Sequence, residues 1–292
     1  MSDTRIARRT DRGVVAVGGE EAASFLNGVI TSTVKTLEAG EARLGALLSP
    51  QGKVLFDFLI TPGSDGYLIE IDRAKVADFV KRLGLYKLRA KVTIVDLSAD
   101  VAVFLAFGGE APAIAGATAF VDPRVAALGT HLLVPTALAD AIAPNASPSD
   151  WHALRIAAGV PESGLDFALG DVFPHDVDMD DLSGVDFKKG CFVGQEVVSR
   201  MKHRGTARRR TILAHAREAR PAWPDAGTEI TCGDKVLGTL GSAHDATALA
   251  LVRLDRAKEA LDSGDAIEAG GVTLTLELPA FAHFDWPKET AE

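Results

Sequence analysis

The sequence has 292 residues, of which 47% are hydrophobic and 24% charged, and its formal net charge is −9. This length allows about two globular domains, and the acidic balance disfavours general affinity for nucleic acid. The two cysteines, Cys191 and Cys232, form neither a Cys-x-x-Cys pair nor the framework of a disulfide-rich protein.

No stretch of the sequence approaches the roughly 18 consecutive apolar residues of a membrane helix. The N-terminal segment MSDTRIARRTDR is basic but lacks the apolar part of a secretory signal. These features predict a cytoplasmic protein that does not enter a membrane.

The first third of the chain is expected to alternate between hairpins and helices, because apolar runs there are bounded by glycine, proline and acidic residues. The expected elements are a strand at 13–17, a helix at 20–27 that ends before Gly28, strands at 42–48 and 54–60, a turn at 62–66 and a strand at 67–71. Asp72 then caps a helix that ends at or near Gly84, with apolar residues at i, i+3, i+4 and i+7.

The middle of the chain continues this alternation. The expected elements are strands at 92–95 and 101–107, a loop at 108–118, and a turn and a strand within 119–135. Ser147 and Pro148 begin a helix that Gly159 closes, and an irregular acidic segment follows at 166–186. Hairpins alternating with helices predict an α+β fold rather than a doubly wound sheet.

Cys191 stands in the stretch DFKKGCFVGQEVVSRMKHR, between Gly190 and Gly194. Apolar residues at helical spacing predict a helix at 195–203 directly after it. A thiol that follows two lysines and precedes a helix N-terminus is of the kind whose pKa falls. The alternative is a small buried residue in a tight turn, because free cysteine is commonly buried.

From residue 211 onward, short apolar runs are separated by glycine turns. The expected elements are strands at 229–232, 235–242, 248–254 and 272–278 and a short helix near 256–261. This pattern predicts a compact, mostly β unit that forms a small barrel.

The run KGCFVGQE at 189–196, followed by Arg200, resembles the K-G-C-[YF]-x-G-Q-E-x-x-x-R signature of the YgfZ family. Members of this family are related to the glycine-cleavage T-protein and act in the maturation of iron–sulfur enzymes. Residues 25–31 are similar to an N-terminal segment of these proteins, and 173–210 is similar to the alphaproteobacterial and mitochondrial branch. The resemblance extends from about Phe25 to Ala280.

The resemblance implies a T-protein-like folate-binding fold, with antiparallel sheets and packed helices, followed by a small C-terminal β-barrel. The expected domains are a folate-binding region at 1–206, a barrel at 207–285 and a tail at 286–292. The implied function is that of an accessory factor in the assembly or repair of iron–sulfur clusters for [4Fe–4S] enzymes.

The same resemblance implies a site centred on Cys191. One thiolate is too few for a cluster, so Cys191 is expected to act in a redox step or as a ligand of a transient cluster shared with an iron–sulfur carrier or assembly protein. The motif residues expected to support it are Lys189, Gly190, Phe192, Gly194, Gln195, Glu196 and Arg200, with Glu196 paired to Arg200 on the helix. Lys188, Lys189 and Arg200 are expected to offset the negative charge of a thiolate-ligated cluster.

Tetrahydrofolate or a related reduced folate is the implied small-molecule ligand, with Asp57 and Arg155 as its candidate contacts. The chain departs from T-proteins at Phe56 and Ala157, which stand where T-proteins have acidic residues. Two alternative functions therefore remain open, a folate-dependent aminomethyl transferase and a non-catalytic folate sensor. Whether the protein is an enzyme is left open as well.

Two charged runs flank the motif. Six cations within 200–210 are expected to face acidic loops of the same chain, with a local anion site as the alternative and RNA unlikely because no aromatic residues are interleaved. The acidic run HDVDMDD at 175–181 is expected to be a solvated or salt-bridged loop, since its spacing is not that of an EF-hand. Cys232 is expected to be structural.

Overall fold

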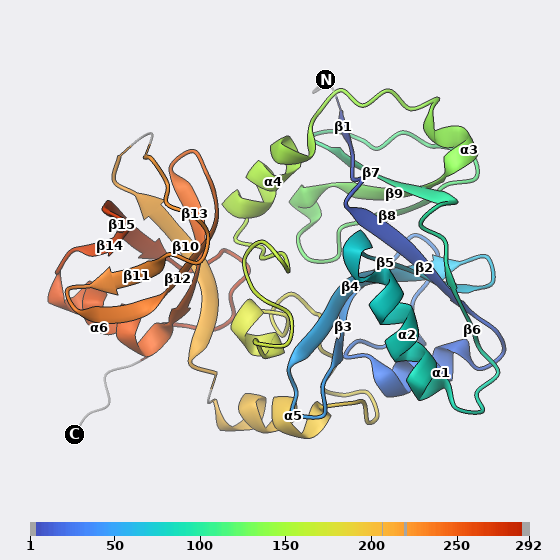
Figure 1. Ribbon diagram of the computed structural model, residues 1–292, viewed down its shortest axis with the longest axis horizontal. Coiled ribbons are helices and arrows are strands. Elements are labelled where there is room, and N and C mark those ends of the chain that lie inside the picture. Colours follow the sequence, from blue (N-terminus) through green and yellow to red (C-terminus); the bar gives the residue numbers. More distant parts are fainter. Residues whose placement is uncertain (1–3, 206, 219–220, 288–292) are drawn as a thin grey trace. The chain divides into compact units, whose positions relative to one another are not determined.

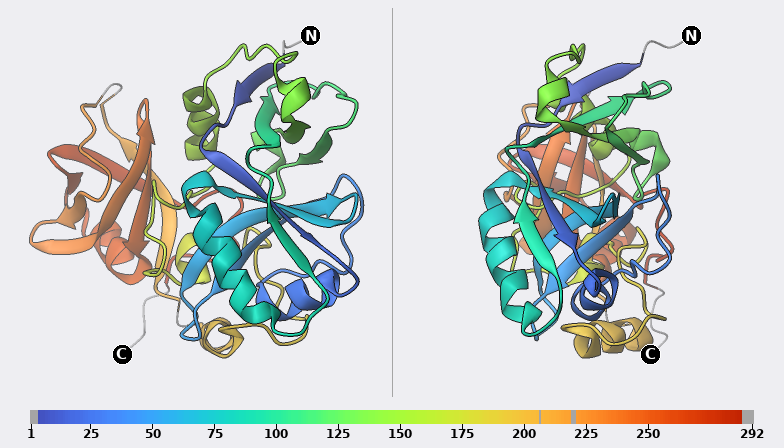
Figure 2. Two further views of the ribbon diagram at one scale, coloured as in Figure 1. Left: turned by 45° about the vertical axis from the view of Figure 1, so that its right-hand side comes forward. Right: turned by 90° about the vertical axis from the view of Figure 1, so that its right-hand side faces the viewer.

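The computed structural model describes residues 4–205, 207–218 and 221–287 of the chain. Two compact units are present (Figure 1, Figure 2). The first contains residues 1–152 and 182–195, and the second contains residues 153–181 and 196–292. The α+β fold class is confirmed.

The first unit is built on an antiparallel five-stranded sheet in the order β3-β4-β5-β2-β6. Its strands are β2 (Arg12–Gly18), β3 (Arg43–Leu48), β4 (Val54–Gly63), β5 (Gly66–Asp72) and β6 (Thr93–Asp96). Helices α1 (Ala22–Val29) and α2 (Val76–Lys87) pack on one face, and the 3₁₀ turn η1 (Arg73–Lys75) leads into α2 (Figure 1). The ring of Phe79 on α2 lies 5.3 Å from the rings of Phe56 and Phe58 on β4, so aromatic packing joins helix to sheet.

The first unit also contains an antiparallel four-stranded sheet in the order β1-β7-β9-β8. Its strands are β1 (Arg5–Arg8), β7 (Val101–Phe107), β8 (Thr118–Val121) and β9 (Thr130–Pro135), with η2 (Ala126–Leu128) before β9 and α3 (Thr136–Ala139) after it. Helix α4 (Pro148–Ala157) follows. Ser147 and Asp150 cap its start reciprocally, with the Asp150 N–H 3.2 Å from Ser147 Oγ and the Ser147 N–H 2.8 Å from Asp150 Oδ2.

The second unit contains a closed six-stranded barrel in the order β10-β13-β12-β11-β14-β15. The predicted small C-terminal β-barrel is confirmed. Its elements are β10 (Arg209–Ala216), β11 (Glu229–Cys232), β12 (Lys235–His244), β13 (Thr247–Arg253), α6 (Leu254–Ser263), β14 (Ile267–Ala269) and β15 (Val272–Glu277). The 3₁₀ turn η3 (Pro174–Val177) and helix α5 (Gln195–Arg204) complete it. In the described part of the chain no helix is long and apolar enough to cross a membrane.

Three turn and cap predictions are wrong. Helix α1 includes Gly28 and ends at Val29, because Val29 packs into the core of the first unit. Helix α2 passes Gly84 and gains another turn, in which Tyr86 packs against the same core. Pro62 lies in β4 rather than in the turn, at a position beyond the last β3 pairing at Ile60, where β4 has only β5 beside it.

The two-unit division also differs from the expected domain at 1–206, because residues 153–181 group with the barrel. Arg155 donates to Ser242 of β12 at 3.0 Å, and Asp166 accepts from the Ser242 N–H at 2.6 Å. These hydrogen bonds hold a segment before the motif to the strands after it. The boundaries at 206 and 285 stay a prediction.

Candidate functional site

The loop that carries Cys191 is fastened to the first unit at its beginning. The Asp186 N–H donates to the Thr31 carbonyl at 3.0 Å, and Thr31 Oγ1 donates to the Gly184 carbonyl at 2.6 Å. The Asp186 carboxylate accepts from the N–H groups of Lys188 and Lys189 at 2.8 and 3.1 Å. This turn sets the direction in which the chain reaches residue 189.

Lys189 is the main attachment of the loop. Its Nζ donates to the carbonyls of Asn27, Ile30 and Ser32 at 2.9, 2.6 and 2.9 Å, so all three ammonium hydrogens are used at the C-terminal end of α1. Unpaired carbonyls at a helix C-terminus favour a cation there. Burial lowers the Lys189 pKa to about 8, so the side chain is still protonated at neutral pH.

Phe192 and Gly194 hold the far side of the loop. Phe192 is 6% exposed, and its ring lies 5.1 Å from Lys189 Nζ. Gly194 has φ +79°, and a Cβ there would lie 2.5 Å from the Ser49 carbonyl oxygen in the β3–β4 turn. Only glycine fits this close approach without moving the backbone.

Cys191 lies between these attachments and is exposed, so the alternative of a buried turn residue is wrong. Gly190 beside it is also exposed, and a Cβ on it would have no atom within 4 Å. The loop therefore presents a reachable thiol from a backbone that is fixed on both sides.

Helix α5 begins at Gln195, whose N–H donates to the Phe192 carbonyl at 3.2 Å. The predicted pair is present, with Arg200 Nη2 3.1 Å from Glu196 Oε1, and both side chains are exposed. An exposed i,i+4 pair contributes about 0.3–0.5 kcal/mol to a helix, so this one does little more than support it.

The lysines of the motif have different roles, which the sequence did not reveal. Lys188 is exposed, whereas the Lys189 ammonium binds backbone carbonyls. Lys188 is therefore free to face a bound cluster, and its role in offsetting the cluster's charge stays a prediction. Lys189 instead attaches the loop to the end of α1.

The two candidate folate contacts lie in different units. Asp57 is on β4 opposite Ala46 and is partly exposed. Arg155 is fully buried in the second unit, where its guanidinium donates to Asp166 at 2.5 Å and to the Val160 carbonyl at 2.7 Å. Ala157 is exposed, and its methyl group cannot accept a hydrogen bond from a pterin. Folate binding by Asp57 and Arg155 stays a prediction.

The acidic run at 175–181 is salt-bridged by the basic run, as the sequence predicted. Arg210 binds Asp180 through two nitrogens at 2.6 and 3.1 Å, and Lys202 Nζ lies 3.4 Å from the same carboxylate. Arg209 Nη2 lies 3.5 Å from Asp176. In the part of the chain that the structure describes, no three His, Cys, Asp or Glu side chains are grouped as a metal ion would need.

The first unit contains a buried charge network that was not predicted from the sequence. His131 of β9 lies between Glu70 of β5, at 2.7 Å from Nδ1, and Asp122, at 3.0 Å from Nε2. All three side chains are at most 2% exposed. Arg12 lies 3.0 Å from Glu70, and Arg124 lies 2.7 Å from Asp122. The residues come from separate elements, so no local motif marks them.

A family model and a solved structure define the structural class of this chain. Residues 208–284 match the family model described as the CAF17 C-terminal beta-barrel domain. The glycine cleavage system aminomethyltransferase T from Bartonella henselae has the same fold, with a TM-score of 0.74 over 98% of this chain and 88% of that one. At 14% identity this likeness concerns the fold alone. The chain is thus an α+β protein with a T-protein-like fold and a C-terminal six-stranded barrel.

Several proteins similar in sequence to this chain are named as iron–sulfur cluster assembly factors. The chain is 32% identical over 229 residues to the iron-sulfur cluster assembly factor IBA57 homolog, mitochondrial, of Mycosarcoma maydis, covering 72% of this chain and 57% of that protein. It is 29% and 28% identical to the mouse and human IBA57 proteins, over 96% of this chain and 85% of theirs. The chain spans about half the length of the fungal relatives it matches. The sequence analysis predicted a resemblance to iron–sulfur maturation proteins with a T-protein-like fold. The relatives support this, and the proteins it concerns are the IBA57 proteins.

One expectation is corrected by these relatives. The sequence predicted a cytoplasmic location, but the fungal, mouse and human relatives are all named as mitochondrial proteins. The relatives are eukaryotic, so they do not bear on the alphaproteobacterial branch.

Proposed function

We propose that this protein is an assembly factor for iron–sulfur clusters that presents Cys191 to a partner carrying the cluster. The observation that carries the proposal is an exposed thiol on a loop fixed by Lys189 on one side and Gly194 on the other. The relatives named as iron–sulfur cluster assembly factors support it.

The proposed step is a ligand exchange on the cluster, which is cargo. A cluster is usually held by four cysteine thiolates, so Cys191 supplies one and the carrier supplies the others. The Cys191 thiol gives its proton to solvent as its sulfur binds iron, and one carrier ligand leaves. No electron is transferred. Fixing the loop beforehand lowers the conformational entropy lost when the shared complex forms.

The test is to mix the reduced protein with a cluster-loaded iron–sulfur carrier and to measure visible absorption across a size-exclusion profile. The wild type and Cys232→Ser should form the same coloured heterodimer, because Cys232 lies on β11 and packs against the barrel core. Cys191→Ser should form none. In a deletion strain, Cys232→Ser should restore the activity of [4Fe–4S] enzymes and Cys191→Ser should not. A coloured complex of equal yield with Cys191→Ser would contradict the proposal.

Binding of tetrahydrofolate is a separate proposal that rests on the fold resemblance, with Asp57 and Arg155 as its candidate contacts. Calorimetry with tetrahydrofolate tests it. Heat of binding that survives Cys191→Ser would support a folate sensor. Release of ammonia from an aminomethylated carrier protein would support the transferase alternative.

A further inference from the structure

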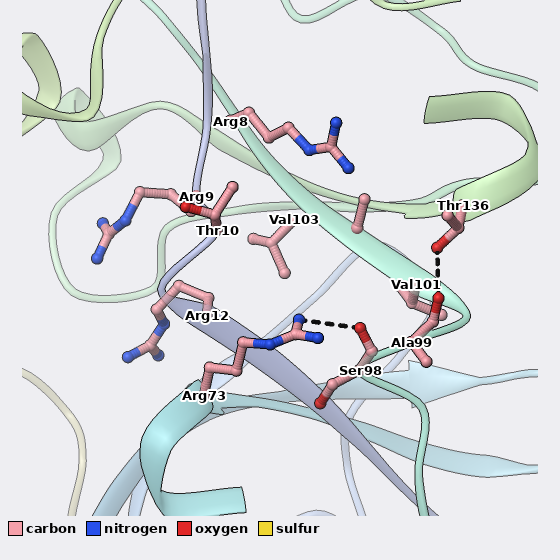
Figure 3. Close-up of a pocket in the computed structure, with 11 residues that line it drawn as sticks. Arg8, Arg9, Thr10, Arg12, Arg73, Ser98, Ala99, Val101, Val103 and Thr136 are labelled. Carbon is pink, nitrogen blue, oxygen red and sulfur yellow. Dashed lines mark hydrogen bonds between the residues drawn. The ribbon is translucent and has the colours of Figure 1, made fainter. Parts of the chain in front are cut away.

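A pocket whose lining is distant in sequence from the cysteine motif lies in the first unit (Figure 3). Its volume is about 370 Å³. The turn between β1 and β2, the 3₁₀ turn η1, the segment before β7, and β7 itself contribute to it. The lining includes Arg8, Arg9, Arg12 and Arg73, which are four guanidinium groups in a chain whose net charge is −9.

Two of these arginines are neutralised by carboxylates. Arg9 lies 2.7 Å from Asp11, and Arg12 lies 3.0 Å from Glu70. Figure 3 shows both side chains turned to the same side, away from Arg8 and Arg73. They contribute walls to the pocket but little net charge.

Arg8 and Arg73 are different. Both are exposed, and within the described residues neither is paired with a carboxylate. Arg73 Nη1 donates to the Ser98 carbonyl at 2.9 Å, and the Arg8 guanidinium lies 5.6 Å from the centre of the Phe104 ring. In Figure 3 both side chains reach toward one side of the pocket with Val103 between them. Two cations held at one pocket without a counterion favour an anionic ligand.

The rest of the lining fits an organic anion better than a bare ion. Val101, Ala102 and Val103 of β7 form an apolar wall. Thr136 Oγ1 donates to the Ala99 carbonyl at 2.9 Å, so its hydrogen is already used within the protein. The volume lies within the range of small-ligand pockets, roughly 300–1,000 Å³.

We propose that this pocket binds the phosphate group of a small phosphorylated molecule, with Arg8 and Arg73 as the phosphate ligands and the β7 wall against its carbon skeleton. A phosphomonoester carries about −1.5 to −2 charges at neutral pH, which matches two guanidinium groups. A single carboxylate carries one charge and matches only one of them. The planar fork of each guanidinium donates two parallel hydrogen bonds to phosphate oxygens. The proposal is independent of the function assigned to Cys191.

Calorimetry on the full chain with inorganic phosphate, glycerol 3-phosphate and succinate, at matched ionic strength, tests the proposal. We expect both phosphates to bind with a dissociation constant on the order of 1 mM or tighter. Arg8→Gln and Arg73→Gln should each weaken binding by at least about tenfold. Arg82→Gln is the matched control, because Arg82 is an exposed residue of α2 outside the pocket. Equal or tighter binding of succinate, or unchanged phosphate binding in both pocket variants, would overturn the proposal.

A second measurement needs no variant. Phenylglyoxal modifies arginine side chains, and peptide mass spectrometry reports the modification at each residue. Phosphate should protect Arg8 and Arg73 in the wild-type protein and leave Arg82 as reactive as before. Equal modification of Arg8 and Arg73 with and without phosphate would likewise refute the site.

Discussion

Gly190 and Gly194 both lie in the loop that carries Cys191, but only Gly194 is required by the backbone. Gly194→Ala places a Cβ 2.5 Å from the Ser49 oxygen at a φ of +79°, whereas the Cβ of Gly190→Ala has no atom within 4 Å. We expect Gly194→Ala to lower the free energy of unfolding by about 1–3 kcal/mol. Gly190→Ala should change it by about 0.5 kcal/mol or less. Urea titration measures both, and equal losses would contradict this account of the loop.

His131 is the residue whose charge state should be visible in the pH dependence of stability. Burial alone would lower its pKa, but Glu70 and Asp122 together raise it above 6.5. Burial alone would raise the pKa of Glu70, yet His131, Arg12 and Arg9 lower it from 4.5 to about 2. The stabilisation from His131 is therefore complete below pH 6.5 and is lost as pH rises through its raised pKa. The stabilisation from Glu70 is complete above pH 4.5 and is lost as pH falls through about 2.

His131→Gln removes this charge while keeping a side chain that can form hydrogen bonds. We expect a loss of about 3 kcal/mol at about pH 5.5 and a clearly smaller loss at about pH 9. Urea titrations at the two pH values measure it. His203→Gln is the control, since His203 is exposed on α5 and should give the same small change at both. A loss for His131→Gln that does not vary with pH would mean that the imidazole is neutral in the folded protein.

Lys189 connects two elements, the motif loop and the C-terminal end of α1. We expect Lys189→Met, which keeps the aliphatic stem, to free the carbonyls of Asn27, Ile30 and Ser32 and to loosen the loop. Hydrogen exchange should rise several-fold at 27–32 and 186–194 at neutral pH, where the lysine is charged. Lys188→Met, which removes an exposed charge next to it, should leave exchange unchanged. Equal exchange in the two variants would show that the loop does not depend on the ammonium group.

Most elements were predictable because their apolar periodicity agrees with the fold. Helices α1, α2, α4 and α5 and barrel strands β11, β12, β13 and β15 all lie where their patterns indicated. The wrong helix ends share a cause. A glycine inside a helix costs about 1 kcal/mol relative to alanine. Packing Val29, directly after Gly28, or Tyr86, shortly after Gly84, against the core offsets that cost. The short strands β1 and β14 were not predicted, since neither contains a clear alternating pattern.

For the whole molecule, the sequence located the candidate site but not what holds it. The cysteine motif is continuous, so its residues could be recognised together. The carbonyls that bind Lys189 lie more than 150 residues before it, and Glu70 lies 61 residues before His131. Contacts of this kind depend on tertiary structure, and a single sequence carries no local signal for them.

The second unit is made of two chain segments, and Arg155 is one of the residues that join them. Its guanidinium binds Asp166 and the Val160 carbonyl in the first segment and Ser242 of β12 in the second. Because Asp166 is only 3% exposed, Arg155→Met would leave a buried carboxylate without its cation. We expect a loss of about 3–5 kcal/mol in the free energy of unfolding, with faster hydrogen exchange in β12.

Arg155→Met/Asp166→Leu should recover part of that loss, because the double variant removes both charges together. Arg217→Met, at an exposed position after β10, should have no effect. A wild-type melting curve for Arg155→Met would show that the two segments hold together without this residue. The stability of Arg155→Met also bears on any test of folate binding. If Arg155→Met is destabilised as expected, failure of that variant to bind tetrahydrofolate would reflect a damaged second unit, and only a variant at Asp57 would test the ligand contact itself.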